Sequence, residues 1–468
     1  MIDIGIVIVY VITLVAIGLK GGKQVKSAAD FTAADKQYGT FVIFATLSAS
    51  FIGGGYSSGN AAAAFENGIG TSLCLFGFGF GMILIGKYVA AGVGRFPSAN
   101  TVGGVITASY GESAGLLTGL FSFVCCAGIV GAQMETIGLI FHALLGVSPT
   151  LGTLLGCGIV LIYTTFGGLG SVIFADIVQF LLLAIGMPLL LLSVIIKAGG
   201  VHSLLADLPP SLLSPLNNTT LPAFLSLFFS LMCGEALAPP YMQRLLIGKS
   251  ATAVAKGTTL SGWFSFPFFL ITGGIGLAAR AMHVTDNPAL AMPALILQTL
   301  PMGLRGILMA AMVSIVLSAA DSFLNGATIS LVCDTILPCI PKLSDRSSLR
   351  LLRLVNLFTG IFAAVISFCV PDVFSILLLA YSFWSPVILV PLVAALLGVR
   401  ADKYTFFISA LSGFFACLIW KVVLHQPFGI DGCLVGIPAN LVAFMLCRWI
   451  RASSMNGQIQ KKEPAVKT

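Results

Sequence analysis

The sequence predicts an all-α integral membrane protein of about thirteen transmembrane helices, organised as a single domain over residues 1–468. Three observations support this fold class: the composition, the length of the apolar segments and the distribution of basic residues. Hydrophobic residues make up 57% of the chain and charged residues only 9%, whereas a soluble protein carries roughly a quarter of charged residues. A water-soluble domain cannot cover its surface with so few charges, so that class is excluded.

Hydropathy predicts thirteen apolar segments, most of them near the ~20 residues that a helix needs to cross a bilayer. The first segment is interpreted as a retained span, because Asp3 stands where a signal peptide has a basic region. The segments cover residues 2–19, 41–67, 70–93, 113–145, 149–165, 171–197, 221–246, 259–283, 303–333, 350–370, 373–398, 404–424 and 432–450.

The basic residues predict the orientation. With the N-terminus outside, all 24 lysines and arginines except Lys197, Arg280, Arg305 and Lys421 fall on the cytoplasmic side, in keeping with the positive-inside rule. The C-terminal tail, residues 452–468, is then cytoplasmic. We expect a plasma membrane location, with a bacterial inner membrane favoured.

Several function classes find no support in the residues. The chain has no Gly-x-x-x-x-Gly-Lys-Ser/Thr phosphate loop, and its cysteines and histidines are too scattered for a metal site. It shows no nucleophile–base constellation, so we expect no enzyme activity and no organic cofactor. Nothing indicates a nucleic-acid partner, and a monomer in the lipid bilayer is the simplest expectation.

Two of the predicted spans are interrupted near their middles. Segment 41–67 contains Gly53-Gly54-Gly55, and segment 221–246 contains Gly234 and Pro239-Pro240. Each opens a run of five spans, and matching interruptions in two halves indicate an inverted-repeat transporter with a site at the membrane midplane. The predicted repeats are 41–197 and 221–398, followed by accessory spans over 404–450. The alternative is that glycine and proline simply permit close helix packing.

Acidic side chains lie inside the predicted spans, where ionisable groups are costly and usually functional. No basic residue is predicted in a span to pair with them, which indicates a bound cation: a metal ion, a proton or an amine. Two roles stay open for Glu135 and Glu235. Either residue could bind an amine on the solute, or it could be protonated and purely structural. The five acids are Glu66, Glu135, Asp176, Glu235 and Asp321.

Segment 303–333 is the most informative of the spans. Ser314, Ser318, Asp321 and Ser322 recur at three- and four-residue spacing, so they share one helix face. Hydroxyl and carboxylate oxygens opposite unwound backbone carbonyls suit a hard alkali cation. Serines that merely bond their own helix backbone are the alternative.

Four motifs carry a resemblance to a known family. In chain order they are Phe51-Ile52-Gly53-Gly54-Gly55-Tyr56, Tyr163-Thr164-Thr165-Phe166-Gly167-Gly168-Leu169 continuing to Asp176 and Gln179, Pro240-Tyr241-Met242-Gln243-Arg244, and Ser318-Ala319-Ala320-Asp321-Ser322. Together they resemble the sodium/solute symporter family, with Ala175 at a position where its signature usually has threonine.

The resemblance implies the leucine-transporter fold and Na⁺ as the coupling ion. Its main sodium site would use the Ile315 carbonyl, the Ser318 hydroxyl and two carbonyls near the first interruption, assigned here to Ala45 and Leu47. The usual second hydroxyl is absent at Ala319. A second site, present in some members, would fall on Asp176, Asp321 and Ser322.

The Gly-Gly-Gly-Tyr and Pro-Tyr-x-Gln-Arg stretches are most similar to the high-affinity choline transporter branch. A quaternary ammonium needs a cage of aromatic ring faces. The cage tryptophans of that branch are Phe51, Ile129 and Ala238 here, so the cage is lost and a smaller or less cationic solute is favoured.

The resulting expectation is a secondary active symporter in which inward Na⁺ flow drives uptake of a small organic solute, with an amino-acid-like or amine-bearing molecule as first guess. The alternatives are proton coupling on the same scaffold, with Asp176 or Asp321 as carrier, and a transporter-like solute sensor. The candidate solute-binding residues are Phe51, Gly53, Gly54, Gly55, Tyr56, Gln133, Glu135 and Glu235.

Overall fold

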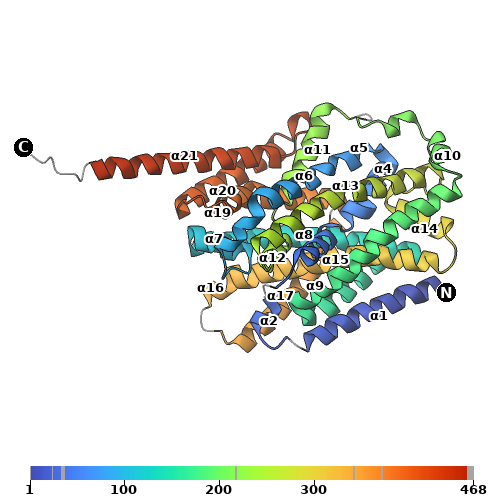
Figure 1. The fold of residues 1–468 in the computed structure, drawn as a ribbon, viewed down its shortest axis with the longest axis horizontal. Helices are drawn as coiled ribbons and strands as arrows, with labels where there is room; N and C mark the ends of the chain where they lie inside the picture. Colours follow the sequence, from blue (N-terminus) through green and yellow to red (C-terminus); the bar gives the residue numbers. More distant parts are fainter. Residues whose placement is uncertain are drawn as a thin grey trace, which may run out of the picture.

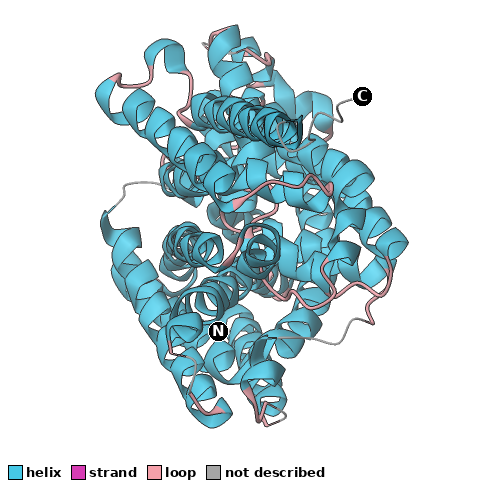
Figure 2. Ribbon diagram, turned by 90° about the vertical axis from the view of Figure 1, so that its left-hand side faces the viewer, coloured by secondary structure: helices cyan, strands magenta, loops and turns pink. Residues whose placement is uncertain are grey.

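The structure is a computed structural model that describes residues 2–23, 25–32, 37–216, 219–340, 343–369 and 373–460. These residues form helices joined by loops and contain no strand beyond an isolated bridge between Tyr38 and Gly248. Figure 2 shows the bundle nearly end-on, with the loops gathered at the helix ends. The predicted all-helical membrane class is confirmed for the described part of the chain.

The helices follow the predicted apolar segments. The first half of the chain contains α1 (Ile2–Gly22), α2 (Ala28–Thr32), α3 (Thr40–Phe51), a π-helical turn (Gly55–Gly59), α4 (Asn60–Asn67), α5 (Gly70–Cys74), α6 (Phe76–Leu84), α7 (Val102–Tyr110), α8 (Glu112–Leu145), α9 (Pro149–Lys197) and α10 (Val201–Ala206). The second half contains α11 (Leu221–Gly234), α12 (Pro239–Leu246), α13 (Ala251–Ala281), α14 (Ala291–Thr299), α15 (Leu304–Ile329), α16 (Leu337–Cys339), α17 (Asp345–Cys369), α18 (Val373–Trp384), α19 (Val390–Leu396), α20 (Lys403–Leu418) and α21 (Cys433–Gln460).

The number of membrane crossings agrees with the thirteen predicted. Ten described helices are long and apolar enough to span a bilayer, and counting each bent pair as one span gives up to 12. One of the ten is α9, which is two helices joined at Gly168, where the backbone is left-handed in φ (63°) and extended in ψ (177°). Glycine tolerates this conformation, and the resulting turn supplies the thirteenth span.

Both predicted interruptions are present. Residues Thr40–Phe51 and Gly55–Asn67 are bent by 67° relative to each other, and Leu221–Gly234 and Pro239–Leu246 by 47°. The proline pair fits the start of α12, because the first helical positions need no N–H bond to a preceding carbonyl. The repeat boundaries 41–197 and 221–398 stay a prediction.

Helix α15 lies at the centre of the bundle and contacts α1, α3, α8, α9, α12 and α17. In its most apolar stretch 94% of the residues are buried, against 22% in α1 and in α21. The outer helices therefore present apolar side chains outward, where a bilayer would cover them. In Figure 1, α1 begins at one end of the long axis and α21 ends at the other, as an odd number of crossings requires.

Helix α21 extends further than the sequence predicted. The tail was expected to begin at residue 452, but the helix continues to Gln460. Residues 461–468 of the predicted tail lie outside the described residues.

Candidate functional site

The interruption between α3 and the turn at Gly55–Gly59 results from close helix packing. A Cβ atom on Gly53 would lie 2.5 Å from Gln133 Oε1 and 2.6 Å from the Cβ of Ala319. Only glycine fits at such a distance, because real Cβ contacts are longer. Helices α8 and α15 therefore approach the backbone at the point where α3 ends.

The interruption frees backbone carbonyls. The N–H of Ile52 still bonds the Ser48 carbonyl, but that of Gly53 turns back to Phe51 (2.9 Å). The N–H of Gly54 donates instead to Gln133 Oε1 at 2.6 Å. The carbonyls of residues 49 and 50 thus lose their helical partners, and they lie at a helix C-terminus, which attracts cations.

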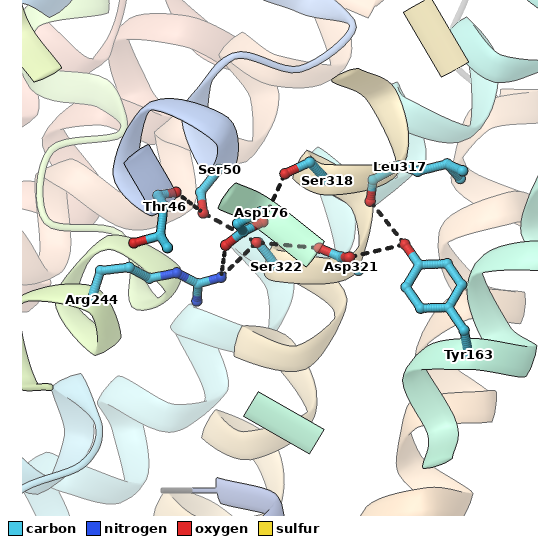
Figure 3. Close-up of polar contacts among 9 residues, drawn as sticks. All are labelled: Thr46, Ser50, Tyr163, Asp176, Arg244, Leu317, Ser318, Asp321 and Ser322. Atoms are coloured by element: carbon cyan, nitrogen blue, oxygen red, sulfur yellow. Dashed lines mark hydrogen bonds and ion pairs between the residues drawn. The ribbon is translucent and has the colours of Figure 1, made fainter. Parts of the chain in front are cut away.

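A buried polar cluster adjoins this helix end (Figure 3). Asp176 of α9 lies at its centre and accepts a hydrogen bond from Ser318 Oγ at 2.7 Å. The guanidinium of Arg244 on α12 donates to Asp176 Oδ2 at 2.9 Å and to Ser322 Oγ at 2.7 Å. Ser50 of α3 lies 3.1 Å from Ser322 through their hydroxyl oxygens. The cluster therefore joins four helices.

Asp321 extends the cluster on the α15 side. Tyr163 donates its hydroxyl proton to Asp321 Oδ2 at 2.9 Å and lies 3.2 Å from the Leu317 carbonyl. Ser322 Oγ donates to the other carboxylate oxygen at 3.3 Å. Both aspartates and Arg244 are fully buried. Counted by formal charge, two carboxylates and one guanidinium leave one net negative charge.

Several polar atoms of the cluster have no hydrogen-bond partner among the described residues. They include Thr46 Oγ1, and Nε and Nη1 of Arg244. Buried polar atoms are nearly always satisfied. Water would complete the bonds of the Arg244 donors, and water or a bound cation those of the Thr46 hydroxyl.

The ion pair corrects one expectation from the sequence. The acids of the spans were predicted to lack a basic partner, and Arg244 was assigned to the cytoplasmic side. Instead, both side chains of the Asp176–Arg244 pair are 0% exposed. The reason is that α12 bends back into the bundle after the interruption, so that its end is covered by α15 and α3.

The remaining predicted ion ligands lie on α15 and α3. Ile315 is buried on α15, one turn before Ser318. Ala45 and Leu47 are buried in the regular part of α3, where the helix itself uses the carbonyls. The freed carbonyls of residues 49 and 50 come one turn later along the chain.

A second polar group lies beside the interruption of α11 and α12. Tyr56 donates its hydroxyl to Glu235 Oε2 at 3.2 Å, and Tyr381 of α18 donates to the same oxygen. The two phenol oxygens are 3.1 Å apart. Glu235, only 2% exposed, lies where α11 ends.

These residues border a small central cavity of about 10 Å³, room for about one water molecule. Of the candidate solute-binding residues, Phe51, Gly53, Gly55, Tyr56, Gln133 and Glu235 line it. Gly54 reaches it only through its bond to Gln133. The cavity wall also includes Ile129, Ala319, Phe323 and Leu377.

Glu135 belongs to a different space, a vestibule of about 580 Å³ that also contains Glu66, Thr136 and Val373. Helix α18 contributes to both spaces: Leu377 lines the central cavity, and Val373 and Leu378 line the vestibule. A Cβ on Gly55 would lie 2.4 Å from Leu377 and 3.7 Å from Val373.

The sequence prediction did not include Arg244, Tyr163, Tyr381 or Ser50 among the site residues. Arg244 and Tyr163 lie within motifs that the sequence comparison used, so the motifs contained a signal for both. Ser50 and Tyr381 have no such signal, because each belongs to the site only through contact with a residue far away in the sequence: Ser50 with Ser322, and Tyr381 with Glu235.

The family comparison agrees with this geometry. The model of the sodium:solute symporter family matches residues 31–413. The chain belongs to this family. The family consists of transporters, and the resemblance inferred from the four motifs is confirmed.

Two relatives illustrate the range of the family. Solute carrier family 5 member 4A of Mus musculus is 25% identical over 74% of this chain, which spans 60% of that relative's length. The sodium/pantothenate symporter of Escherichia coli is also 25% identical, over 88% of each chain. The relatives support Na⁺ as the coupling ion of the family.

The fold is that of a solved Na⁺-coupled sialic acid symporter in a substrate-bound, outward-open state. The TM-score is 0.81 at 17% identity, over 95% of this chain and 98% of that one. MhsT in complex with L-phenylalanine matches with a TM-score of 0.56 at 14% identity, over 88% and 99% of the two chains. The predicted leucine-transporter-like fold is thereby confirmed.

Proposed function

We propose that the protein is a secondary active symporter that couples inward Na⁺ flow to the uptake of a small organic solute by alternating access. The observation that carries this proposal is the buried oxygen cluster at the end of α3, which has one net negative charge when both of its aspartates are ionised. One monovalent cation would neutralise it, and an alkali ion prefers such carbonyl, hydroxyl and carboxylate oxygens.

The ion would bind between α3 and α15. Ser318 donates its proton to Asp176, so the lone pairs of its hydroxyl oxygen point elsewhere and remain available to a cation. The Ile315 carbonyl and carbonyls from the end of α3 would complete this site, with Ala45 and Leu47 as the assignment from the family motif. Asp176, Asp321 and Ser322 would provide the carboxylate side.

The solute would occupy the central cavity after the site expands. A cavity of about 10 Å³ is too small for an organic molecule, so its walls have to move apart before a solute can bind. The vestibule would receive the solute, and a movement of α18, which lines both spaces, would connect them at Leu377. Closure of the vestibule and opening on the opposite side would then release the solute and the ion.

The orientation and location follow the basic residues. We propose an N-terminus outside and a C-terminus in the cytoplasm of a bacterial inner membrane. Under this orientation, the vestibule opens to the outside, because it lies at the end of the bundle that contains Asn67 and Asn287.

A sodium-binding measurement tests the proposal without knowledge of the solute. Purified protein should bind ²²Na⁺ saturably, and Ser318→Ala should weaken that binding roughly tenfold because one oxygen ligand is removed. Ser409→Ala is the matched control, since Ser409 is buried on α20 and bonds only the Phe406 carbonyl (3.0 Å). Absence of saturable ²²Na⁺ binding to the unaltered protein would contradict sodium coupling.

Proton coupling is the second candidate function. It is favoured by the surroundings of Asp321, a buried acid without an ion-pair partner among the described residues. Its side chain contacts hydroxyl groups of Tyr163 and Ser322 and forms none of the ion pairs of the described residues. A thermal-shift screen with and without Na⁺ would first identify the solute. Uptake of that solute is then measured at fixed pH with Na⁺ replaced by K⁺. If uptake persists, proton coupling through Asp321 is favoured over sodium coupling.

A further inference from the structure

We infer that the transported solute carries a protonated amine that binds Oε1 of Glu235. This inference rests on the proposed function, because it assigns the solute class of the central cavity. It depends on the hydrogen bonds of one buried carboxylate, on the rings around it and on the charge of the vestibule.

Glu235 is a buried acid without an internal cation. The described residues contain four ion pairs, and each joins an aspartate to a lysine or arginine. Asp176 in the neighbouring cluster has Arg244 as its counter-ion. Glu235 has only the neutral phenols of Tyr56 and Tyr381. Because an isolated charge in a membrane interior is costly, Glu235 in its ionised form needs a positive group that the described residues do not supply.

The hydrogen bonds leave one carboxylate oxygen for the ligand. Both phenols donate to Oε2, and among the described residues no donor lies within hydrogen-bond distance of Oε1. Oε1 is also absent from the fully enclosed polar atoms that lack a partner, as expected for an atom at the cavity wall. An ammonium N–H can therefore complete this carboxylate, as a charge-assisted hydrogen bond.

The cavity wall distinguishes an organic cation from a metal ion. Phe51, Tyr56 and Phe323 line the cavity beside Glu235, and ring faces attract organic cations. A sodium ion would need several oxygen ligands here, whereas the rings supply carbon. A quaternary ammonium is disfavoured in turn, because it cannot donate a hydrogen bond to Oε1 and because Ile129 and Ala319 occupy much of the remaining wall.

The vestibule has the charge that would attract such a solute. Its lining contains Glu66 and Glu135 and no lysine, arginine or histidine. A cleft lined by one sign of charge concentrates counter-ions and speeds their binding. The path from the vestibule to Glu235 is therefore acidic at both ends.

Matched ligand pairs test the inference. Purified protein in Na⁺ is titrated in a thermal-shift assay with ethanolamine, butylamine and phenethylamine, and with the alcohols of the same carbon skeletons. Tetramethylammonium serves as the quaternary cation. We expect at least one amine to stabilise the protein at a concentration where its alcohol and tetramethylammonium do not. If no amine exceeds its alcohol, or if tetramethylammonium binds as tightly as the amines, the inference is wrong.

Variants locate the interaction. Glu235→Gln should weaken amine binding roughly tenfold or more, since a charge-assisted bond to the ammonium is lost, while stabilisation by Na⁺ alone is retained. Glu112→Gln is the matched control, because Glu112 is exposed in the first turn of α8 and lines neither the vestibule nor the central cavity. It should change amine affinity less than threefold. Unchanged amine binding in Glu235→Gln would overturn the assignment.

Two further readouts keep the test decisive. If Glu235→Gln does not fold, Tyr381→Phe replaces it: this variant keeps the carboxylate, so the preference for amine over alcohol should persist, and its loss would count against Glu235 as the anchor. Stabilisation by Na⁺ without any amine is measured in every variant. Its absence from the unaltered protein would refute the proposed sodium coupling, whereas its presence without amine selectivity would refute only the amine.

Discussion

The Asp176–Arg244 pair supports a quantitative prediction about stability. Both side chains are 0% exposed, so removal of Arg244 leaves the two carboxylates of the cluster without a counter-ion. Such a loss typically costs about 3–5 kcal/mol. Arg244→Gln should therefore lower the free energy of unfolding by about this amount. Asp176→Asn should cost less, because Asp321 keeps a negative charge in the same cluster as the Arg244 guanidinium.

A double variant separates the pair from its surroundings. Asp176→Asn combined with Arg244→Gln removes both charges, and the two new amides can bond each other. The combined loss should therefore be clearly smaller than the two single losses added together, as for residues in direct contact.

The assay is unfolding of the purified protein by sodium dodecyl sulfate in mixed micelles. Arg305→Gln is the matched control: it breaks the pair with Asp3, but Arg305 is 29% exposed, so a loss of at most about 1 kcal/mol is expected. The reasoning is refuted if Arg244→Gln is as mild as Arg305→Gln, or if the double variant loses as much as both single variants together.

Two further predictions concern the interruption after α3. Gly53→Ala should lower stability by about 1–3 kcal/mol through overpacking, because its Cβ would meet Gln133 and Ala319 within 2.6 Å; Gly170→Ala, with open space around its Cβ, should leave the same unfolding curve unchanged. Ala319→Ser should lower the half-saturating Na⁺ concentration in ²²Na⁺ binding about threefold by supplying a second hydroxyl ligand. A higher concentration would place the ion away from this residue.

The sequence predicted the fold well because the signals for it are local. Apolar runs of spanning length, the three glycines at 53–55 and the proline pair at 239–240 each act on the segment that contains them. The turn at Gly168 belongs to the same class, since a glycine pair between two apolar runs marks a bend. Thirteen spans and both interruptions could therefore be placed without any contact between segments.

The partners within the site were harder to predict, because they are distant in the chain. The sequence predicted no basic partner within the spans for the buried acids. Arg244 lies near the end of an apolar run, but α12 is bent by 47° relative to α11, and Arg244 pairs with Asp176 inside the bundle.

The position of the freed carbonyls is likewise a tertiary effect. The glycine run locates the interruption, but the N–H of Gly54 leaves the helix because Gln133 accepts it at 2.6 Å. The sequence assigned the ligand carbonyls to Ala45 and Leu47, which stays a prediction, whereas the carbonyls of residues 49 and 50 became candidates only through that contact. Tyr381 was missed for a similar reason, since a hydroxyl on an apolar helix does not change the hydropathy.

The geometry also explains how an ion and a solute can influence each other. Ser50 contacts Ser322 in the aspartate cluster at 3.1 Å, and Gly53, three residues later, lines the central cavity. Only Phe51 and Ile52 separate the two residues along the chain, so we expect them to shift together. An ion that fixes Ser50 against α15 therefore also fixes the cavity wall, and a solute that holds the wall in place holds Ser50 in return. Such coupling is reciprocal by thermodynamic necessity, and in this chain it requires only the few residues at the end of α3.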